Sequence, residues 1–312
     1  MKIIVTGAAG EVGINLLLLM NKKENNIIAI DKNNNNLRIL KKLCPEIKTL
    51  DADLAYKGRW EKYFRNTDVV IQLQAQISSL DEKAYLKNNI HSVQNVIAVC
   101  EKYHVANLIH ASSSVVISVA KDNYTETKRT GEKIVKNSRI PYTILRPSLM
   151  YGCFDIKHLS YLIRMFERYP FFLMPGSGKY VRQPLYVEDF CNVILSCASM
   201  KPENKLYNII GKEKINLIDC LKIIFHERKK NITFIKIPLP LFHLLIQVYG
   251  FINRKTPIVS DQLTSLTAGD IFPVIAWDNT FHVKSTPYAE GVRKMITSKY
   301  YDYDKRMVRI EY

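Results

Sequence analysis

The stretch KIIVTGAAGEVGINLLLLM, residues 2–20, decides the fold of this chain. Its start is rich in β-branched residues, which is typical of a buried parallel strand. Glycines then recur at every third position, and an apolar segment with the character of a helix follows them. Glycine lets a backbone approach a phosphate closely, and a helix N-terminus offers free N–H groups and a positive dipole end. The stretch therefore predicts a strand–loop–helix unit that binds a dinucleotide through Gly7, Gly10, Glu11, Val12 and Gly13.

An acidic residue ends the second predicted strand. NIIAID stops at Asp31, 18 residues after Gly13. A carboxylate there can accept hydrogen bonds from the ribose hydroxyls of adenosine and would repel a 2′-phosphate. This favours NAD over NADP, although the neighbouring Lys32 softens the preference. The simpler alternative is that Asp31 is an ordinary turn residue.

Strands and helices then alternate along the chain. Further strands are expected near IKTLDADL (47–54), at 68–76 and at 105–114, with a helix over 88–104 between the last two. This alternation predicts an α/β fold with a doubly wound parallel sheet of the Rossmann type. At the strand ends, four more residues are expected to contact the cofactor: Asp53, Leu54, Leu73 and Gln74.

Two parts are expected within the 312 residues. Residues 1–150 are predicted to form the NAD-binding Rossmann domain. Residues 151–312 are predicted to form a smaller α+β substrate lobe, some segments of which return to the Rossmann sheet. The last residues, 302–312, read as a charged and disordered tail.

Composition restricts the class of protein. A hydrophobic content of 47% and a charged content of 24% are typical of a soluble globular chain. The net charge of +16 is spread along the sequence without an aromatic-interleaved basic stripe, so no nucleic acid partner is expected. The six cysteines are scattered and form no C-x-x-C pair, so we expect no metal site and no disulfides. Without a signal peptide, the expected location is cytoplasmic.

No segment is long and apolar enough to span a membrane, but residues 238–253 come nearest. The stretch PLPLFHLLIQVYGFIN begins with two prolines and continues as an apolar helix. We expect it to pack inside the substrate lobe. The alternative is peripheral contact with a membrane face.

Several motifs occur in an order that is similar to one family. TGAAGEVG resembles a TGxxGxxG loop, HASSSVV a serine-bearing strand, and Tyr124 with Lys128 a YxxxK pair. YTILRPSLMYG (142–152), VRQPLYVEDF (181–190) and KLYNIIG (205–211) match later segments. Over roughly residues 1–225 the chain therefore resembles the extended short-chain dehydrogenase/reductase family, which contains NAD-dependent nucleotide-sugar epimerases, dehydratases and reductases.

The resemblance implies a catalytic set of Ser113, Tyr124 and Lys128. Residues four apart share one helix face, so Tyr124 and Lys128 can meet one cofactor and one substrate hydroxyl. A lysine cation beside a phenol lowers the pKa of the phenol, which would let Tyr124 act as acid and base. The resemblance makes Ser113 a hydrogen-bond donor to the substrate, with Ser112 and Ser114 as neighbours. It also makes Lys128 a contact to the nicotinamide ribose.

The resemblance also implies substrate contacts. Arg182 is expected to bind the diphosphate of a nucleotide sugar, because a guanidinium fork suits phosphate oxygens. Tyr151 is expected at the rim of the cleft. The chain departs from the family in the short spacing from Ser113 to Tyr124, in Leu149 where asparagine is common, and in Gln74. These departures leave the sugar open.

The predicted function is epimerisation of a nucleotide-linked sugar through a transient keto intermediate. One alternative is an NAD(P)H-dependent reductase of a keto-sugar, and the other is a catalytically silent NAD-binding scaffold. By analogy with the family, a homodimer is expected through helices over 88–104 and 124–137.

Overall fold

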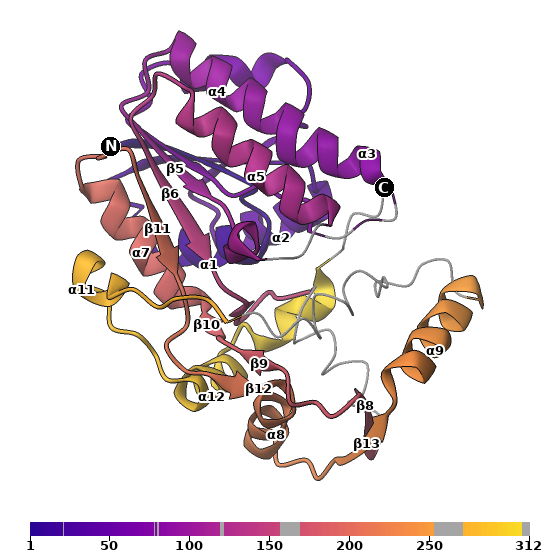
Figure 1. Cartoon of the computed structure of the whole chain (residues 1–312). Helices are drawn as coiled ribbons and strands as arrows, with labels where there is room; N and C mark the ends of the chain where they lie inside the picture. Colours follow the sequence, from indigo (N-terminus) through magenta and orange to yellow (C-terminus); the bar gives the residue numbers. More distant parts are fainter. Residues whose placement is uncertain are drawn as a thin grey trace.

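The computed structural model describes residues 1–20, 22–77, 79, 81–118, 122–156, 169–252 and 271–307. A parallel sheet of seven strands forms its centre, in the order β11-β6-β5-β4-β1-β2-β3 (Figure 1). The strand order reverses direction between β1 and β4, which is the point where a doubly wound sheet binds its ligand. The bounds are β1 Lys2–Thr6, β2 Asn26–Asp31, β3 Lys48–Asp51, β4 Val69–Gln72, β5 Asn107–Ala111, β6 Tyr142–Pro147 and β11 Lys205–Ile209.

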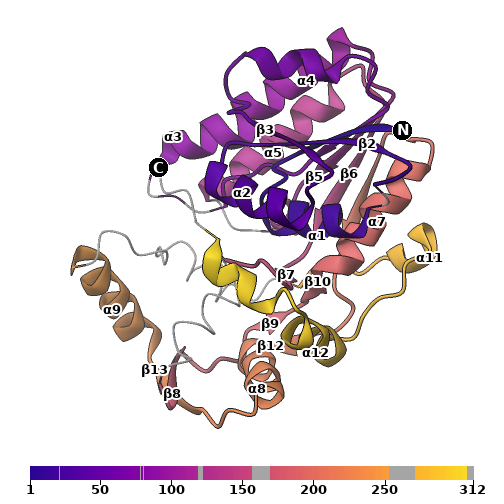
Figure 2. The same ribbon diagram turned by 180° about the vertical axis from the view of Figure 1, so that it is seen from behind.

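Helices cover both faces of this sheet. Alternate residues of β1 divide between two cores, because side chains along a strand point to opposite faces. Ile4 lies in the core under α4 and α5, and Ile3 and Val5 lie in the core under α1, α2 and α7, whose side is seen in Figure 2. The bounds are α1 Glu11–Leu19, α2 Asn34–Leu43, α4 Ser92–Lys102, α5 Asn123–Lys136 and α7 Val187–Ser199.

Short elements connect these layers. They are η1 Arg59–Phe64, α3 Glu82–Tyr85, η2 Leu86–His91 and η3 Ser114–Ile117. The element η2 is a π-helical segment that continues directly into α4. It occupies the start of the helix predicted over 88–104.

The remaining part of the chain forms a smaller lobe of short strand pairs and helices. β7 pairs with β10, β9 with β12, and β8 with β13. A third core, which includes Phe172, Leu221 and Val292, holds this lobe together. Its elements are β7 Met150–Tyr151, β8 Phe171–Pro175, β9 Val181–Arg182, β10 Leu185–Tyr186, β12 Ile215–Asn216, α8 Leu217–Glu227, β13 Thr233–Ile237, α9 Leu239–Ile252 and α12 Tyr288–Thr297. Two further elements, α11 Trp277–Phe281 and η4 Tyr301–Arg306, pack against the core under α1, α2 and α7.

The predicted fold class is confirmed. After the first strands of the lobe, the chain returns to the layers of the seven-stranded sheet. β11 adds to the edge of the sheet beside β6, and α7 packs in the same core as α1. Helix α7 and strand β11 therefore pack with the layers of the seven-stranded sheet.

The C-terminal tail is ordered over the residues that can be described. The rings of Tyr300 and Tyr303 pack against Phe154, with centroid distances of 5.8 and 6.1 Å. The prediction of a disordered tail is therefore wrong for residues 302–307, because aromatic side chains anchor them to the body. Residues 308–312 lie outside the described part.

The apolar segment predicted over 238–253 forms α9, which begins beside Gly176 and stands away from both layers (Figures 1 and 2). Leu241, Leu244, Leu245 and Val248 are between 44% and 54% exposed. The expectation of internal packing is wrong for these four side chains, because β13 carries the helix outward from the lobe. Residue 253 lies outside the described part.

Among the described residues, no group of side chains is arranged to hold a metal ion. No helix within this part of the chain is long and apolar enough to cross a membrane. All six cysteines are free thiols and are buried.

Candidate active site

The glycine loop after β1 is shaped by backbone contacts that leave no room for side chains. Gly7 has a φ of +67°, and a Cβ there would lie 2.5 Å from the backbone nitrogen of Gln74. A Cβ on Gly13 would lie 2.5 Å from the carbonyl oxygen of Ala8. No side chain caps the N-terminus of α1 at Gly10. The first turn of α1 thus faces the pocket in a form that suits a diphosphate.

Asp31 links the end of β2 to this loop. One carboxylate oxygen accepts a hydrogen bond from the backbone N–H of Ala9 at 2.9 Å, and the other accepts from Asn33 at 2.9 Å. Asp31 lines the same pocket as the glycine loop. Its position is the one expected of a ribose-binding carboxylate, and it also holds the loop in place.

A charged cluster lies beside Asp31. The Nζ of Lys32 lies 3.5 Å from a carboxylate oxygen of Asp53 and donates to Asn88 at 2.5 Å, and Lys87 lies 3.0 Å from the same oxygen of Asp53. Burial lowers the pKa of Lys32, an effect that Asp53 partly offsets. Against the opposing effect of burial, hydrogen bonds from Ala55 and Lys87 hold the pKa of Asp53 below its usual value. The charge of Lys32 is thus largely engaged by protein groups, which limits its attraction for a 2′-phosphate.

The other predicted cofactor contacts also line this pocket, namely Glu11, Val12, Leu54, Leu73 and Gln74. The structure adds lining residues that the sequence did not single out. Two of them, Gln76 and Asn88, share a hydrogen bond of 3.1 Å. Met307 comes from the far end of the chain. No local pattern marks these residues, because tertiary packing alone brings them to the pocket.

Tyr124 and Lys128 lie on one face of α5 and line the same pocket as the glycine loop. Lys128 is 4% exposed and donates a hydrogen bond of 2.7 Å to the carbonyl of Ala111. Burial lowers the pKa of Lys128 to about 8, an effect that Glu132 partly offsets. Burial raises the pKa of Tyr124 to about 12, and a hydrogen bond with Ser113 partly offsets that rise.

The three adjacent serines have different surroundings in the structure. The hydroxyl of Ser112 donates to the carboxylate of Glu132 at 2.6 Å, and Ser114 is buried at 3% exposure. Ser113 caps η3, where its side chain accepts a hydrogen bond from the backbone N–H of Val115, and it lowers the pKa of Tyr124 against the larger effect of burial. Of the three, Ser112 is the one that lines the pocket of Tyr124.

Two buried networks fix α5 against the sheet. Glu132 receives two hydrogen bonds from the guanidinium of Arg146 on β6, at 2.7 and 2.6 Å. Asn89 on η2 donates to the hydroxyl of Thr127 at 3.0 Å and to the carbonyl of Gln76 at 2.9 Å. These bonds orient the helix that carries Tyr124 and Lys128, and sequence patterns did not indicate them.

The two predicted substrate residues lie in the lobe. Tyr151 is 1% exposed, packs against Tyr186 and Tyr288, and donates its hydroxyl to the carbonyl of Tyr288 at 3.3 Å. This position gives Tyr151 a packing role and does not support substrate contact. Arg182 lies on β9 opposite Ile215, is 9% exposed, and does not line the pocket of Tyr124 among the described residues.

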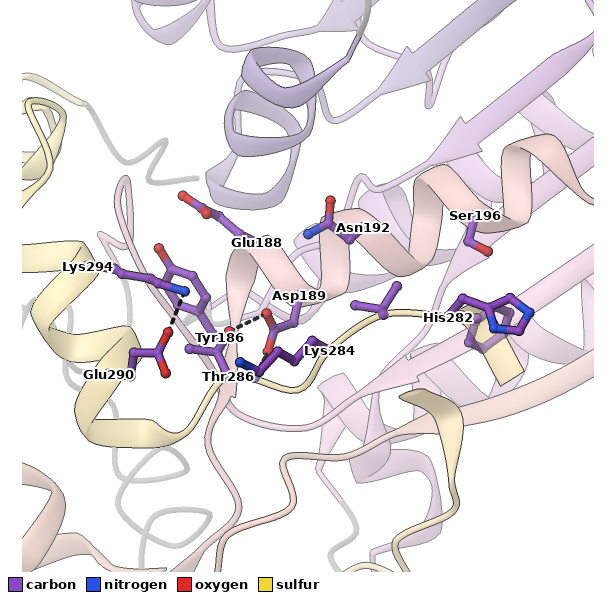
Figure 3. Close-up of a pocket in the computed structure, with 12 residues that line it drawn as sticks. Tyr186, Glu188, Asp189, Asn192, Ser196, His282, Lys284, Thr286, Glu290 and Lys294 are labelled. Carbon is purple, nitrogen blue, oxygen red and sulfur yellow. Dashed lines mark hydrogen bonds and ion pairs between the residues drawn. The ribbon is translucent and has the colours of Figure 1, made fainter. Parts of the chain in front are cut away.

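A second hollow lies between α7 and α12 (Figure 3). Three of its charged groups have partners: Thr286 donates to Asp189 at 2.7 Å, and Lys294 pairs with Glu290 at 2.8 Å. None of the predicted catalytic or cofactor residues lines it. The pocket of Tyr124 is therefore the candidate active site.

Comparison with known families decides the class of this pocket. The family model described as the NAD dependent epimerase/dehydratase family matches residues 3–209. The chain belongs to this family. The matched region contains the glycine loop, Asp31 and the Tyr124–Lys128 pair, so the predicted family, an NAD-dependent enzyme class, and NAD as cofactor are confirmed.

Two proteins that are similar in sequence to this chain are named as sugar epimerases. The chain is 27% identical over 264 residues to the "Uncharacterized UDP-glucose epimerase YtcB" of Bacillus subtilis (strain 168), covering 72% of this chain and 81% of that one. It is 23% identical over 275 residues to the N-acetyl-alpha-D-glucosaminyl-diphospho-ditrans,octacis-undecaprenol 4-epimerase of Escherichia coli O157:H7, covering 81% and 80%.

Solved structures share the fold over nearly the whole chain. The UDP-glucose 4-epimerase of Thermotoga maritima superposes with a TM-score of 0.76 at 18% identity, covering 98% of this chain and 99% of that one. The UDP-glucuronic acid 4-epimerase of Bacillus cereus, in complex with NAD, gives a TM-score of 0.70 at 22% identity, covering 99% and 97%.

Proposed function

We propose that this family member is an NAD-dependent epimerase of a nucleotide-linked sugar. The observation that carries the proposal is that Tyr124 and Lys128 line the same pocket as the glycine loop. A proton-transfer group thus lies beside the cofactor site, as oxidation of a sugar hydroxyl requires.

In the proposed reaction, Tyr124 as phenolate accepts the proton of the sugar hydroxyl while the C–H bond of the same carbon breaks. When bound, NAD would supply the acceptor and donor for the hydride. A keto-sugar forms and presents its other face, and Tyr124 then gives the proton back to the oxygen. Atoms and electrons balance over the cycle, and the only change is the configuration at one carbon.

The protonation states support these roles. Lys128 is mainly a cation at pH 7, because its pKa is about 8. Tyr124 is protonated without the cofactor, because burial raises its pKa to about 12. A cationic nicotinamide ring adds a positive charge to that of Lys128, and both favour the phenolate. Formation of the base is thereby coupled to occupation of the cofactor site.

For the substrate, we propose that Arg182 binds the diphosphate, as the resemblance to the family implies. We also keep the homodimer through η2, α4 and α5 as a proposal. A second candidate substrate is a lipid-linked sugar diphosphate. The exposed apolar side chains of α9 favour it, and the Escherichia coli O157:H7 relative is named for such a compound.

The substitution Tyr124→Phe tests the catalytic assignment. We expect turnover on UDP-, GDP-, dTDP- and polyprenyl-linked sugars to fall by about 10²-fold or more, since a positioned acid and base contributes that much. NAD affinity should change little. Tyr169→Phe, an exposed tyrosine of the lobe, is the matched control. Full activity of Tyr124→Phe would refute the role given to Tyr124.

A further inference from the structure

The helix α9 presents an apolar stripe to solvent. Leu241, Leu244, Leu245 and Val248 are 47%, 54%, 44% and 50% exposed. Their spacing of three and four residues places them on one side of the helix. Isolated exposed leucines are ordinary, but a continuous stripe of four marks an interaction surface.

The attachment of α9 to the lobe leaves this stripe outward. β13 pairs with β8, and Leu239 at the start of α9 lies beside Gly176, directly after β8. The helix then leads away from the rest of the molecule, and both views show it apart from the layers that form the catalytic pocket (Figures 1 and 2). The strand pair β8–β13 thus holds the start of α9. The apolar stripe lies apart from the pocket of Tyr124.

The charge of the segment that leads into α9 favours a partner with negative charge. Residues 228–252 contain Arg228, Lys229, Lys230 and Lys236 and no aspartate or glutamate. Lys229, Lys230 and Lys236 are exposed on the segment that leads into α9. The chain as a whole carries a net charge of +16. An apolar stripe joined to cations without carboxylates matches an anionic lipid surface, where acyl chains meet the stripe and headgroups meet the lysines.

We propose that α9 docks this enzyme on the surface of an anionic bilayer. The helix lies in the interface and does not cross it, since α9 has only 14 residues. A second copy of this chain would also cover apolar side chains, but its own residues 228–252 contain no carboxylate to pair with these lysines. The charge therefore favours the lipid over a copy of itself.

Vesicle flotation of the full chain tests this proposal. We expect binding to phosphatidylcholine vesicles that contain 30% phosphatidylglycerol, and binding at least about tenfold weaker to pure phosphatidylcholine. The double variant Leu244→Glu/Val248→Glu should reduce binding to the anionic vesicles by at least about tenfold, because carboxylates in the stripe oppose both contacts. The matched control is Leu19→Glu/Met200→Glu, which places two carboxylates at exposed apolar positions elsewhere and should bind as the wild type does.

Two readouts keep the test separate from the proposed function. NAD affinity and turnover on a soluble nucleotide sugar should be equal in the wild type and the Leu244→Glu/Val248→Glu variant. Vesicle binding is measured independently of turnover, so a wild type that binds anionic vesicles but turns over no sugar still supports docking through α9. The proposal is overturned if the wild type ignores anionic vesicles, if the variant binds them equally, or if light scattering shows a wild-type dimer that the variant dissolves.

Discussion

At the scale of single residues, Ser112 and Ser113 are adjacent in sequence but have different partners. Ser112 donates a hydrogen bond to the buried carboxylate of Glu132, whereas Ser113 caps η3 and lowers the pKa of Tyr124. The sequence predicted Ser113 only by resemblance, because three consecutive serines give no internal reason to choose one. The side-chain contacts supply that reason.

Replacing each of these two serines by alanine should therefore give opposite phenotypes. Ser113→Ala should lower turnover by about 100-fold with little change in melting temperature, because a donor to the reacting oxygen is lost. Ser112→Ala should lower the free energy of unfolding by about 1–3 kcal/mol, because Glu132 loses a buried partner, with near-normal turnover per folded molecule. Kinetics and urea denaturation measure both effects, and exchanged phenotypes would contradict the assignment.

Lys128 is a buried lysine whose charged form lowers the free energy of unfolding, because burial disfavours the cation. The pKa of Lys128 is about 8 in the folded protein, whereas a solvated lysine, as in the unfolded chain, has a pKa of 10.5. This difference corresponds to about 3 kcal/mol in the free energy of unfolding. Between these two values the unfolded chain binds more protons than the folded one. The contribution of Lys128 to the free energy of unfolding therefore rises as pH increases through this window.

Lys128→Met should remove this pH dependence together with activity. We expect the free energy of unfolding of the wild type, relative to the variant, to increase by about 1 kcal/mol or more from pH 7.5 to pH 9.5. Turnover of the variant should fall by about 10²-fold. Lys133→Met, which removes an exposed lysine of the same helix, should alter neither quantity. A constant difference between wild type and Lys128→Met across this range would contradict the account.

At the scale of elements, local patterns predicted the parts of the site that follow strands directly. The glycine loop and Asp31 were readable from the strand–turn–helix pattern, and the Tyr124–Lys128 pair was readable from the order of motifs that resembles the family. The hydrogen bond from Asn89 to Thr127 and the position of Met307 in the pocket lining could not be predicted from the sequence. They depend on how distant segments pack, which a single sequence does not encode in any short pattern.

The junction of β1 and α1 gives a prediction at this scale. Gly13→Ala should lower the free energy of unfolding by about 1–3 kcal/mol and weaken NAD binding, because its Cβ would lie 2.5 Å from the backbone oxygen of Ala8. Gly58→Ala is the control, since its Cβ would approach only the side chain of Trp60, at 3.3 Å. Thermal unfolding with and without NAD measures both effects. Equal behaviour of the two variants would argue against a closely packed loop.

At the scale of the whole molecule, the sheet unit and the lobe are interwoven. α7 and β11 follow the first part of the lobe in sequence but complete the sheet layers, so the lobe is attached to the cofactor unit at several points. The composition predicted a globular chain and the alternation predicted its sheet. The exposure of α9 was not predicted, because an apolar helix has the same sequence whether it is buried or at the surface.

The central claim is that hydride leaves the sugar, stays on the bound cofactor and returns to the same sugar. The most direct measurement uses a UDP-sugar deuterated at C4, incubated with the enzyme and catalytic NAD, followed by mass spectrometry of both epimers. We predict many turnovers per enzyme, full retention of deuterium in the product and no net formation of NADH. Loss of the label would contradict return of the hydride to the same sugar. No conversion of the deuterated sugar, together with consumption of one NADH for each keto-sugar turned over, would contradict epimerisation and identify a reductase.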